Sequence, residues 1–395
     1  MQRDHDVILF GATGFTGRLV ADYLSKTPGA GRWAIAGRSR DKLAALGLGV
    51  PIVVADAMDP IAMADVARRT RVVCTTVGPF SKYGSALVAA CAEAGTHYCD
   101  LTAEVHWMRA MIDQHDATAR RTGARIVHAC GFDSIPSDLG ALLAQDLMIA
   151  RHGRPAERVT AYYGSMSGGV SGGTLASALA IAEASKDRAV RRVLGDPYGL
   201  DPDPRAPMPP APDERRIRWD PERKTFTMPF VMAASNTRIV RRSHALAGYP
   251  WGRDFVYREV QTVKPTPLGL ALGVGMTAGM LAFLLAAGND RLRPLIARRL
   301  PQPGEGPSAG TRARGFWKLE VVAASGPERV TYRLEDSADP GYGSTARMLA
   351  ESALCLAHDP LGSAPGFTTP AVAMGHALAQ RLRAAGLTLE EGQRT

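Results

Sequence analysis

A glycine-rich turn near the start of the chain constrains the fold more than any other stretch. It reads GATGFTG at residues 11–17 and stands between an apolar run, DVILF, and a helical pattern, RLVADYLSK. Glycine allows a close backbone approach to a pyrophosphate, and the following helix offers free N–H groups and its positive dipole end to that anion. The alternative is a turn that binds no ligand. In this strand–turn–helix context we expect dinucleotide contacts from these residues: Gly11, Thr13, Gly14, Phe15, Thr16 and Gly17.

The first 131 residues alternate short apolar runs with helical patterns. Buried strands that alternate with amphipathic helices predict a parallel, doubly wound sheet of the Rossmann type, with helices on both faces. The expected fold class is therefore α/β. The strands are expected at 6–10, 33–36, 51–57, 72–78 and 124–131, and the helices include 84–94 and 105–121.

Beyond Gly131 this alternation fades, and the pattern favours a second, α+β domain with a mixed sheet. Nine prolines between residues 197 and 229 predict a loop, and Thr174 is expected to cap a helix at 174–185. The expected strands of this domain are 157–164, 225–233, 253–263, 316–323 and 329–335. We expect an NADP-binding domain at 1–140, a substrate or lipid domain at 141–345, and C-terminal helices within 346–395, among them 370–385, that pack back on the first domain.

The residue that reads the cofactor ribose should stand at the end of the second strand. NAD enzymes usually place Asp or Glu there, but the sequence at 37–40 is GRSR, and no acidic residue comes before Asp41. Arg38 can hold a 2′-phosphate and Ser39 can donate to it, so we expect NADP; the alternative is a solvated loop arginine. Further contacts are expected where the third and fourth strands end, from Asp56 near the adenine and from Gly78 and Pro79 near the ribose.

Composition narrows the classes of partner. The chain has 46% hydrophobic and 22% charged residues, an ordinary globular balance. Its net charge of +9 is spread along the sequence without a basic block, which fits anionic partners such as a phosphorylated cofactor, an acyl carrier or an anionic membrane face, and not a nucleic acid. Five cysteines without a CxxC pair predict neither a disulfide framework nor a metal site. The N-terminus has no apolar signal region, so we expect a cytoplasmic start.

Several motifs together resemble the saccharopine dehydrogenase-like oxidoreductases, and within them the mycobacterial trans-acting enoyl reductases. They are GATGFTG at 11–17, AGR at 36–38, TTVGPF at 75–80, YCDLTAE at 98–104, ACGFDSIPSD at 129–138, SGGT at 171–174, NTRIVRRS at 236–243 and TPAVAMG at 369–375. The resemblance implies a Rossmann domain with an inserted α+β domain, and reduction of a carbon–carbon double bond in a lipid or polyketide intermediate, in trans with a synthase. Animal relatives associate with lipid bodies and membranes.

An enoyl reduction needs hydride delivery, a donor for the enolate oxygen and a proton for the α-carbon. No tyrosine has a lysine four residues later, so the Tyr-x-x-x-Lys dyad of ketone-reducing enzymes is absent from the sequence. The candidates near strand ends are Tyr83, Asp133 and Ser134. Packing against the cofactor is the alternative role of Tyr83, and capping of a following helix is that of Asp133 and Ser134.

An uncharged apolar run at 268–288 is long enough, at about 31 Å as a helix, to cross a bilayer core. Four arginines follow it within eleven residues. The run is expected to be embedded in or lie on a membrane; the alternatives are a helix buried between domains or in a homodimer, and a true span. A span would separate the residues after it from the domain that they complete.

The interpretation is an NADPH-dependent oxidoreductase, most simply an enoyl reductase of lipid or glycolipid biosynthesis. Its substrate would be a lipid, acyl or polyketide intermediate, carried on a carrier protein. It would work at the cytoplasmic face of the plasma membrane or in the cytoplasm. The rivals are a saccharopine-type imine reductase and a non-catalytic NADP-binding protein of lipid surfaces.

Overall fold

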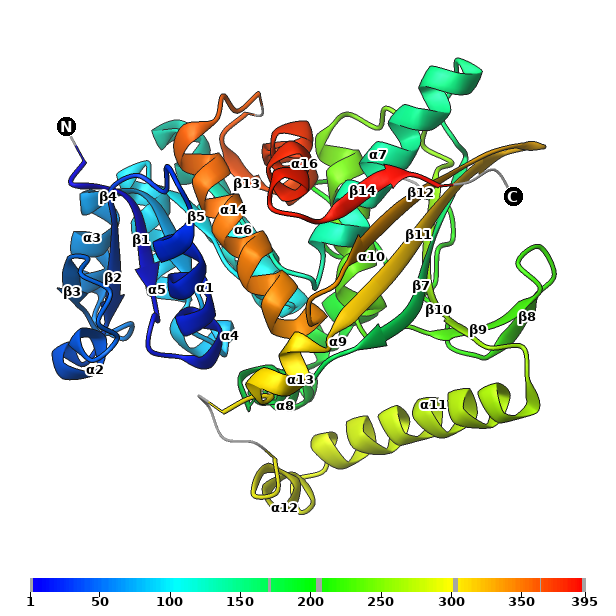
Figure 1. The fold of residues 1–395 in the computed structure, drawn as a ribbon, viewed down its shortest axis with the longest axis horizontal. Coiled ribbons are helices and arrows are strands. Elements are labelled where there is room, and N and C mark those ends of the chain that lie inside the picture. Colours follow the sequence, from blue (N-terminus) through cyan, green and yellow to red (C-terminus); the bar gives the residue numbers. More distant parts are fainter. Residues whose placement is uncertain (1–2, 170–171, 204–207, 301–304, 363, 393–395) are drawn as a thin grey trace.

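Two seven-stranded sheets form the frame of the described residues, which are 3–169, 172–203, 208–300, 305–362 and 364–392 of this computed structural model (Figure 1). In the first sheet every strand pair is parallel, and the order is β13-β6-β5-β4-β1-β2-β3. Its strands are β1 (His5–Phe10), β2 (Trp33–Gly37), β3 (Ile52–Val54), β4 (Thr70–Thr75), β5 (His97–Cys99), β6 (Arg125–Val127) and β13 (Gly366–Thr368). The predicted doubly wound α/β class is confirmed.

Helices cover both faces of this sheet, and the side chains of β1 alternate between them. Val7 and Leu9 join the core beneath α1 (Phe15–Lys26) and α14 (Thr345–His358). Ile8 and Phe10 join a second core beneath α3 (Pro60–Arg69), α5 (Ser85–Ala94) and α6 (Val105–Thr122). The short helices α2 (Arg40–Ala44) and α4 (Phe80–Tyr83) follow strand ends. This two-sided burial explains why the strands are almost wholly apolar.

The second sheet is mixed, as predicted, and has the order β14-β12-β11-β7-β10-β9-β8. Only β7 and β10 pair in parallel among its described strands. The strands are β7 (Arg158–Ser167), β8 (Arg218–Asp220), β9 (Thr225–Pro229), β10 (Val256–Val263), β11 (Phe316–Ser325), β12 (Glu328–Asp336) and β14 (Thr388–Glu391). Helix α7 (Ile135–His152) packs on it so closely that a Cβ on Gly140 would lie 2.8 Å from Val321 Cγ2.

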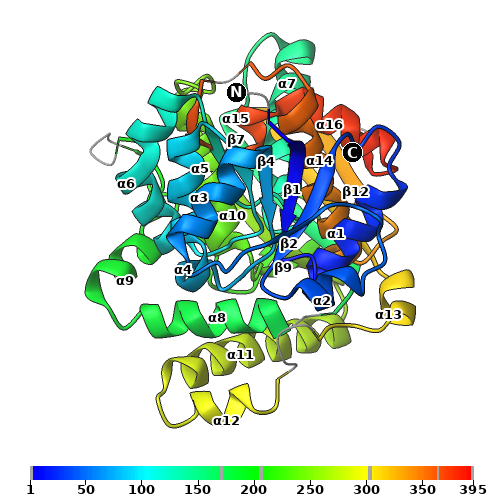
Figure 2. The same cartoon turned by 90° about the vertical axis from the view of Figure 1, so that its left-hand side faces the viewer.

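The remaining helices belong to the second domain and to the C-terminal segment. In Figure 2, α8 (Gly172–Ala184) and α11 (Pro267–Gly288) lie one beneath the other below the first sheet. The others are α9 (Arg188–Gly195), α10 (Ala233–Leu246), α12 (Arg293–Ala297), α13 (Ala309–Ala313), the π-helical turn η1 (Pro340–Ser344), α15 (Pro370–Ala373) and α16 (Gly375–Ala384).

The structure differs from the sequence predictions at several elements. The segment 197–229 is not all loop: β8 and β9 occupy its end, because most of its prolines precede residue 213, whereas Pro221 lies in the hairpin turn and Pro229 ends β9. Thr174 lies inside α8, which already begins at Gly172, and is not its cap. The helix expected at 370–385 is broken at Met374. The segment 346–395 also adds a strand to each sheet, β13 and β14.

Candidate functional site

The glycine-rich turn lies at the carboxyl edge of the first sheet, between β1 and α1. Gly11 has a φ of +93°, and a Cβ there would lie 2.6 Å from Val77 Cγ2. A Cβ on Gly17 would lie 2.1 Å from the Gly11 carbonyl oxygen, so this glycine lets α1 approach the turn. Both positions therefore require glycine for reasons within the protein itself.

Gly14 is different, because nothing in the protein demands glycine there. Its φ is −70°, and the nearest protein atom to an added Cβ is the Gly11 carbonyl oxygen at 3.3 Å. It precedes α1, whose first turn has neither a side-chain cap nor an acidic residue. The free N–H groups and the open space beside Gly14 fit a dinucleotide pyrophosphate. Thr13 lies in this turn, and Phe15 and Thr16 begin α1 beside it; their contacts with a dinucleotide stay a prediction.

The predicted ribose and adenine contacts lie at the neighbouring strand ends. Arg38 follows β2 and is exposed, and among the described residues no carboxylate pairs with it. Ser39 caps α2 by accepting from the Lys42 N–H at 3.4 Å. Contrary to expectation, Asp56 does not lie at the end of β3, because that strand stops at Val54. The Asp56 carboxylate lies in the turn beyond, where it accepts a hydrogen bond from the Met58 N–H at 2.9 Å.

A buried carboxylate fixes the loop after β4. Glu104 accepts from the backbone N–H groups of Phe80, at 2.7 Å, and Ser81, at 3.0 Å, and so holds the start of α4 directly after Gly78 and Pro79. The Ser177 hydroxyl of α8 also donates to Glu104, at 3.3 Å. The second domain therefore meets the first at this loop.

The second domain also covers the glycine-rich turn. The Phe15 ring packs edge-on against Tyr342 of η1, with centroids 4.9 Å apart, and the Arg312 guanidinium lies 5.4 Å from its centroid. Deeper in, the Thr345 hydroxyl accepts from the Phe132 N–H at 3.1 Å. The candidate site is therefore a junction between the two sheets, roofed by α8 and η1.

Among the proposed catalytic residues, Asp133 has the most suitable environment. It lies between β6 and α7 and is half-buried. Burial raises its pKa to about 7, with a further contribution from the charge of Asp100. Its carboxyl group is therefore partly protonated near neutral pH, which suits an acid at a strand end.

The neighbouring residue Asp100 has a structural place. Its carboxylate accepts from the Tyr98 hydroxyl at 2.9 Å and from the Ala129 N–H at 3.1 Å, and it pairs with His128 Nδ1 at 2.8 Å. Ala129 has a φ of +60°, unusual for a residue with a Cβ. These bonds fix the loop between β6 and Asp133 and so fix the position of Asp133.

The Ser134 side chain belongs to a buried polar network of the second domain. Its hydroxyl donates to Asn236 Oδ1 at 3.0 Å, and Asn236 Nδ2 donates in turn to Ser137 Oγ and to Glu259 Oε1, both at 3.2 Å. Tyr163 bonds the same Ser137 hydroxyl at 2.7 Å. Ser134 precedes α7 but makes no side-chain capping bond.

Glu259 is the member of this network that the sequence analysis missed. Burial raises its pKa to about 7, and its Oε2 atom has no hydrogen-bond partner among the described residues. The available signal was the alternation along β10, in which Tyr257 and Glu259 share a face and both are buried. An acidic residue at an inward position of a strand indicates a buried network.

Tyr83 lies apart from these residues. It ends α4 and packs against the core beneath α3, α5 and α6, with the Lys82 ammonium 5.1 Å from its ring centroid. Within the described residues no hydrogen bond joins it to Asp133 or Ser134. Asp133 and Ser134 follow β6, whereas Tyr83 follows β4, and β5 lies between these two strands.

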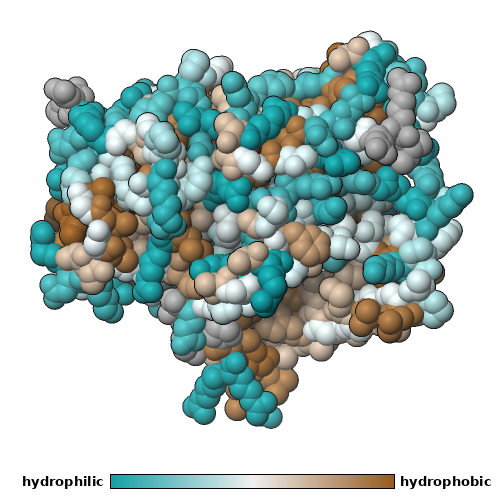
Figure 3. Space-filling model, viewed as in Figure 1, coloured by the Kyte–Doolittle hydropathy of each residue, from teal (hydrophilic) through white to brown (hydrophobic). Residues whose placement is uncertain are grey.

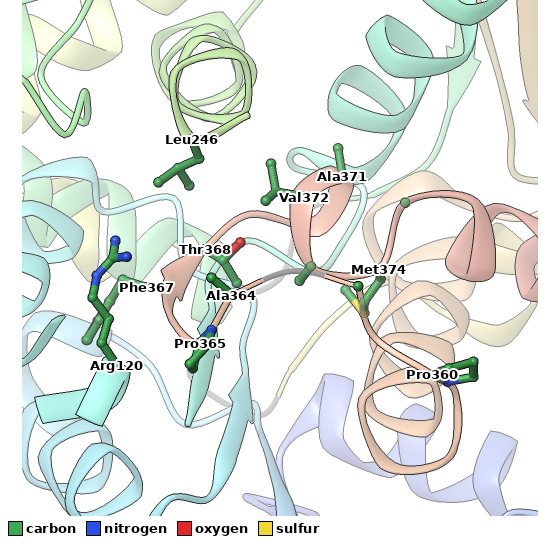
Figure 4. A pocket seen from close by; sticks show the side chains of 13 residues that line it. Arg120, Leu246, Pro360, Ala364, Pro365, Phe367, Thr368, Ala371, Val372 and Met374 are labelled. Carbon is green, nitrogen blue, oxygen red and sulfur yellow. The ribbon is translucent and has the colours of Figure 1, made fainter. Parts of the chain in front are cut away.

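A pocket of about 320 Å³ lies beside β13 and away from the glycine-rich turn (Figure 4). Arg120 near the end of α6 and Pro360 after α14 line it. Residues from both ends of β13 line it, but none of the residues that line it belongs to the turn after β1 or to the ends of β2 and β4. This pocket is therefore not the candidate cofactor site. In the described ranges no three His, Cys, Asp or Glu side chains gather as a metal site, and all five cysteines are buried thiols.

Comparison with known proteins decides the family. Residues 7–127 match the saccharopine dehydrogenase NADP-binding domain. The chain is 40% identical to the trans-acting enoyl reductase of Mycobacterium tuberculosis over 98% of both chains, and 39% identical to that of Mycobacterium leprae over 98% of both. A second M. tuberculosis protein, whose name as a trans-acting enoyl reductase is provisional, is 44% identical over 98% of this chain and 97% of its own. The chain belongs to the saccharopine dehydrogenase-like family.

This membership confirms the predicted resemblance and an NAD(P)-binding domain, and it makes the chain a homologue of oxidoreductases. Among solved structures, the yeast saccharopine dehydrogenase that forms L-glutamate aligns over 98% of this chain and 99% of its own, with a TM-score of 0.54 and 14% identity. At that identity the likeness shows the fold of this saccharopine dehydrogenase-like protein and nothing of its substrate.

Proposed function

We propose that this protein is an NADPH-dependent reductase of the enoyl double bond in a lipid or polyketide intermediate. The observation that carries the proposal is the likeness to trans-acting enoyl reductases, which extends through the second domain as well as the cofactor domain. The site is compatible with it, because an open helix N-terminus, a strand-end arginine and a carboxyl group with a raised pKa lie along one sheet edge.

Arg38 is the basis for proposing NADPH over NADH. It is exposed beside the turn of Gly11 and Gly14, and the first acidic side chain after β2 is Asp41, inside α2. A guanidinium without a carboxylate partner can bind a 2′-phosphate, whereas a diol gains little from it. Ser39, whose hydroxyl caps α2, can donate to the same phosphate.

Residues of the protein would supply the proton, the positioning and the exclusion of water that the reaction needs. Reduced nicotinamide, when bound, supplies the hydride. Asp133, with a pKa raised to about 7 by burial, is the proposed donor to the developing enolate or to the α-carbon. Ser134 and Asn236 anchor the start of α7 beside it, and α8 and η1 exclude water. Tyr83 stays the second candidate donor.

The substrate is proposed to be an acyl or polyketide thioester on a carrier, handled at the cytoplasmic face of the membrane. The apolar surface of α11 directly below α8 supports a lipid-facing setting. The saccharopine-type rival would use substrates with several carboxylates and has no specific support in this site. Homodimer formation stays a prediction.

The test is steady-state oxidation of NADPH with enoyl-CoA and enoyl-carrier substrates. We expect turnover with NADPH that Asp133→Asn lowers at least about tenfold in kcat while leaving the Kd for NADPH unchanged. Turnover of an oxo acid with an amino acid in place of the enoyl substrate would establish the imine-reductase rival. NADPH binding without turnover of either substrate class would establish the non-catalytic one.

Cofactor choice has its own variants. Arg38→Asp is expected to weaken NADPH binding by about 2 kcal/mol or more and NADH binding far less. Arg121→Asp makes the same charge change at the end of α6, on the far edge of the sheet, and is the matched control. Gly14→Val should abolish binding of both cofactors without unfolding the protein, since its side chain would fill the pyrophosphate space. Equal affinities of the unmutated protein for NADPH and NADH would contradict the cofactor proposal.

A further inference from the structure

Helix α11 leaves most of its apolar surface uncovered. It has 22 residues and no charged side chain, and it is the single helix in the described ranges that is long and apolar enough to cross a membrane. Leu268 and Leu285 are 71% and 68% exposed. The other exposed apolar side chains of the helix are Leu272, Val274, Met276, Leu281 and Leu284. A surface of this kind indicates an interaction site.

The protein holds this helix along one narrow stripe and at both ends. At the start, a Cβ on Gly269 would lie 2.3 Å from the Lys264 carbonyl oxygen, and one on Gly273 would lie 3.3 Å from Val263 of β10. At the end, Arg293 ion-pairs with Glu183 of α8. The chain then returns through β11 to the second sheet. Because both ends are tied to one domain, the helix lies flat along the molecule (Figure 1).

Basic side chains accompany the apolar surface. Arg291, Arg298 and Arg299 are exposed around α12, and Lys264 is exposed before α11. The nearby Asp290 is engaged by Lys186 and by Arg293. Apolar side chains gather on the lower surface in Figure 3, and hydrophilic ones project at its lowest point. Among the described residues no carboxylate pairs with these four basic side chains, so the surface combines apolar area with positive charge.

We propose that α11 and α12 dock this protein on an anionic lipid bilayer, with α11 lying in the plane of the interface and the arginines on headgroup phosphates. Binding of a helix at a membrane interface strengthens with the apolar area that it buries and with the attraction of basic residues to anionic lipids, and α11 with the arginines after it supplies both. The inference goes beyond the proposed reaction, since it concerns the surface on which the protein works and not the bond that it reduces.

A second copy of the chain fits this surface less well. An antiparallel pairing of two α11 helices would bring the arginines after one helix towards Lys264 before the other, and a parallel pairing would bring the two arginine groups together. Both arrangements oppose like charges. A partner helix would also cover one stripe, whereas exposed residues surround α11 on every side but one. Lipid covers the whole surface and supplies the negative charge.

The docking would place the cofactor side of the molecule towards the bilayer. Helix α8 packs on α11 and also bonds Glu104 through Ser177, at the loop that follows β4. With α11 in the bilayer interface, α8 would lie between the membrane and the carboxyl edge of the first sheet (Figure 2).

The experiment is flotation of the purified full-length protein with phosphatidylcholine vesicles, with and without phosphatidylglycerol. We expect binding to the anionic vesicles that falls as salt is raised. Leu272→Glu with Leu285→Glu should reduce partitioning about tenfold or more, and Arg298→Glu should reduce it about fivefold. Ile149→Glu, which charges an exposed apolar side chain near the end of α7 and outside α11 and α12, should change nothing.

Three results would overturn the proposal. One is an unmutated monomer that floats with neither vesicle. Another is a soluble dimer that the leucine variants dissociate, which would make the surface an interface between copies. The third is a C-terminal tag that protease cannot reach in inside-out membrane vesicles, which would mean that α11 crosses the bilayer. Unchanged melting temperature and NADPH affinity in the leucine variants show that they fold.

Discussion

Helices α10 and α11 invert the usual relation between polarity and burial. Helix α10 contains three arginines, yet Arg238, Arg241 and Arg242 are each at most 4% exposed. Helix α11 contains no charge, yet most of its leucines face outward. The two helices belong to the same domain and follow one another along the chain.

Helix α10 can be buried because backbone carbonyls satisfy its arginines. Arg242 donates to the carbonyl oxygens of Leu200, at 2.6 Å, and Phe367, at 2.7 Å. Arg241 donates to those of Pro197, Ala211 and Tyr257. The arginines thereby hold the proline-rich segment, which has few backbone partners of its own. Burial therefore follows from available partners and not from hydropathy. Helix α11 packs on α8 along one stripe, and among the described residues nothing covers most of its remaining surface.

The largest expected effect comes from removing an arginine of α10. Arg242→Met should lower the free energy of unfolding by about 2–5 kcal/mol, because two buried carbonyls lose their donor. Urea titration measures it. Arg299→Met, an exposed arginine after α12, is the control and should stay within about 0.5 kcal/mol. A neutral Arg242→Met would mean that burial of α10 does not depend on these bonds.

A second effect comes from the carboxyl group that faces α10 through Asn236. Glu259 titrates near 4.5 when unfolded, and burial raises its pKa to about 7 in the folded protein. The folded state thus keeps a proton that the unfolded state has lost, so this contribution is full below pH 4.5 and disappears as the pH rises through 7.

Glu259→Gln should therefore remove up to roughly 3 kcal/mol of the fall in stability across that range. Urea midpoints at several pH values measure it, with Glu157→Gln, at an exposed carboxylate just before β7 of the same domain, as the control. The groups around Glu259 are Ser137, Asn236, Tyr163, Tyr257 and the charge of Asp213. If the stability of Glu259→Gln depended on pH as that of the unmutated protein does, a group other than Glu259 would be the one that binds the proton.

Two glycines of α11 separate its packed stripe from its free surface. A Cβ on Gly269 meets the Lys264 carbonyl, whereas one on Gly275 meets nothing within 4 Å. Gly269→Ala should destabilise the protein by about 1–3 kcal/mol through overpacking. Gly275→Ala should stabilise it by up to about 1 kcal/mol, since alanine favours the helix. Thermal unfolding of both variants measures these changes in stability. Equal shifts of the two melting temperatures would mean that Gly269 does not lie on the packed side of the helix and Gly275 on the free side.

The smallest expected effect tests the exposure of α11 directly. Leu285→Ser should change the free energy of unfolding by no more than about 0.5 kcal/mol in the absence of lipid. Leu354→Ser on α14 replaces a buried leucine and should cost several times more. A loss above about 1 kcal/mol at Leu285 would show that protein covers this surface in solution.

The sequence predicts an element of the structure well where residues close in the sequence determine that element. The β1–turn–α1 unit was predictable because Gly11 and Gly17 are required by backbone contacts. Strands β5 and β13 were not, since each has three residues and, unlike β3 and β6, neither lies within a longer apolar run. The burial of α10 depends on carbonyls supplied from distant segments, which no local pattern contains.

The candidate site divides in the same way. Its cofactor half follows from position, because strand ends of a parallel sheet share one edge, which places Gly14 and Arg38 after the neighbouring strands β1 and β2. Its second-domain half depends on tertiary contacts. The pairing of Ser134 with Asn236, and the proximity of Glu259, require α7, α10 and β10 to be placed first.

Strand β13 is synthesised long after β6, its partner in the sheet, and this order affects folding on the ribosome. Strand β6 leaves the ribosome with its outer edge open, and the strand that pairs with it comes only after the whole second domain. The same delay leaves the face of β1 that carries Val7 and Leu9 covered by α1 but not by α14 until late in synthesis. An open strand edge beside a partly covered apolar face favours association between nascent chains. We therefore expect the growing polypeptide to be most prone to such association before its last helices emerge.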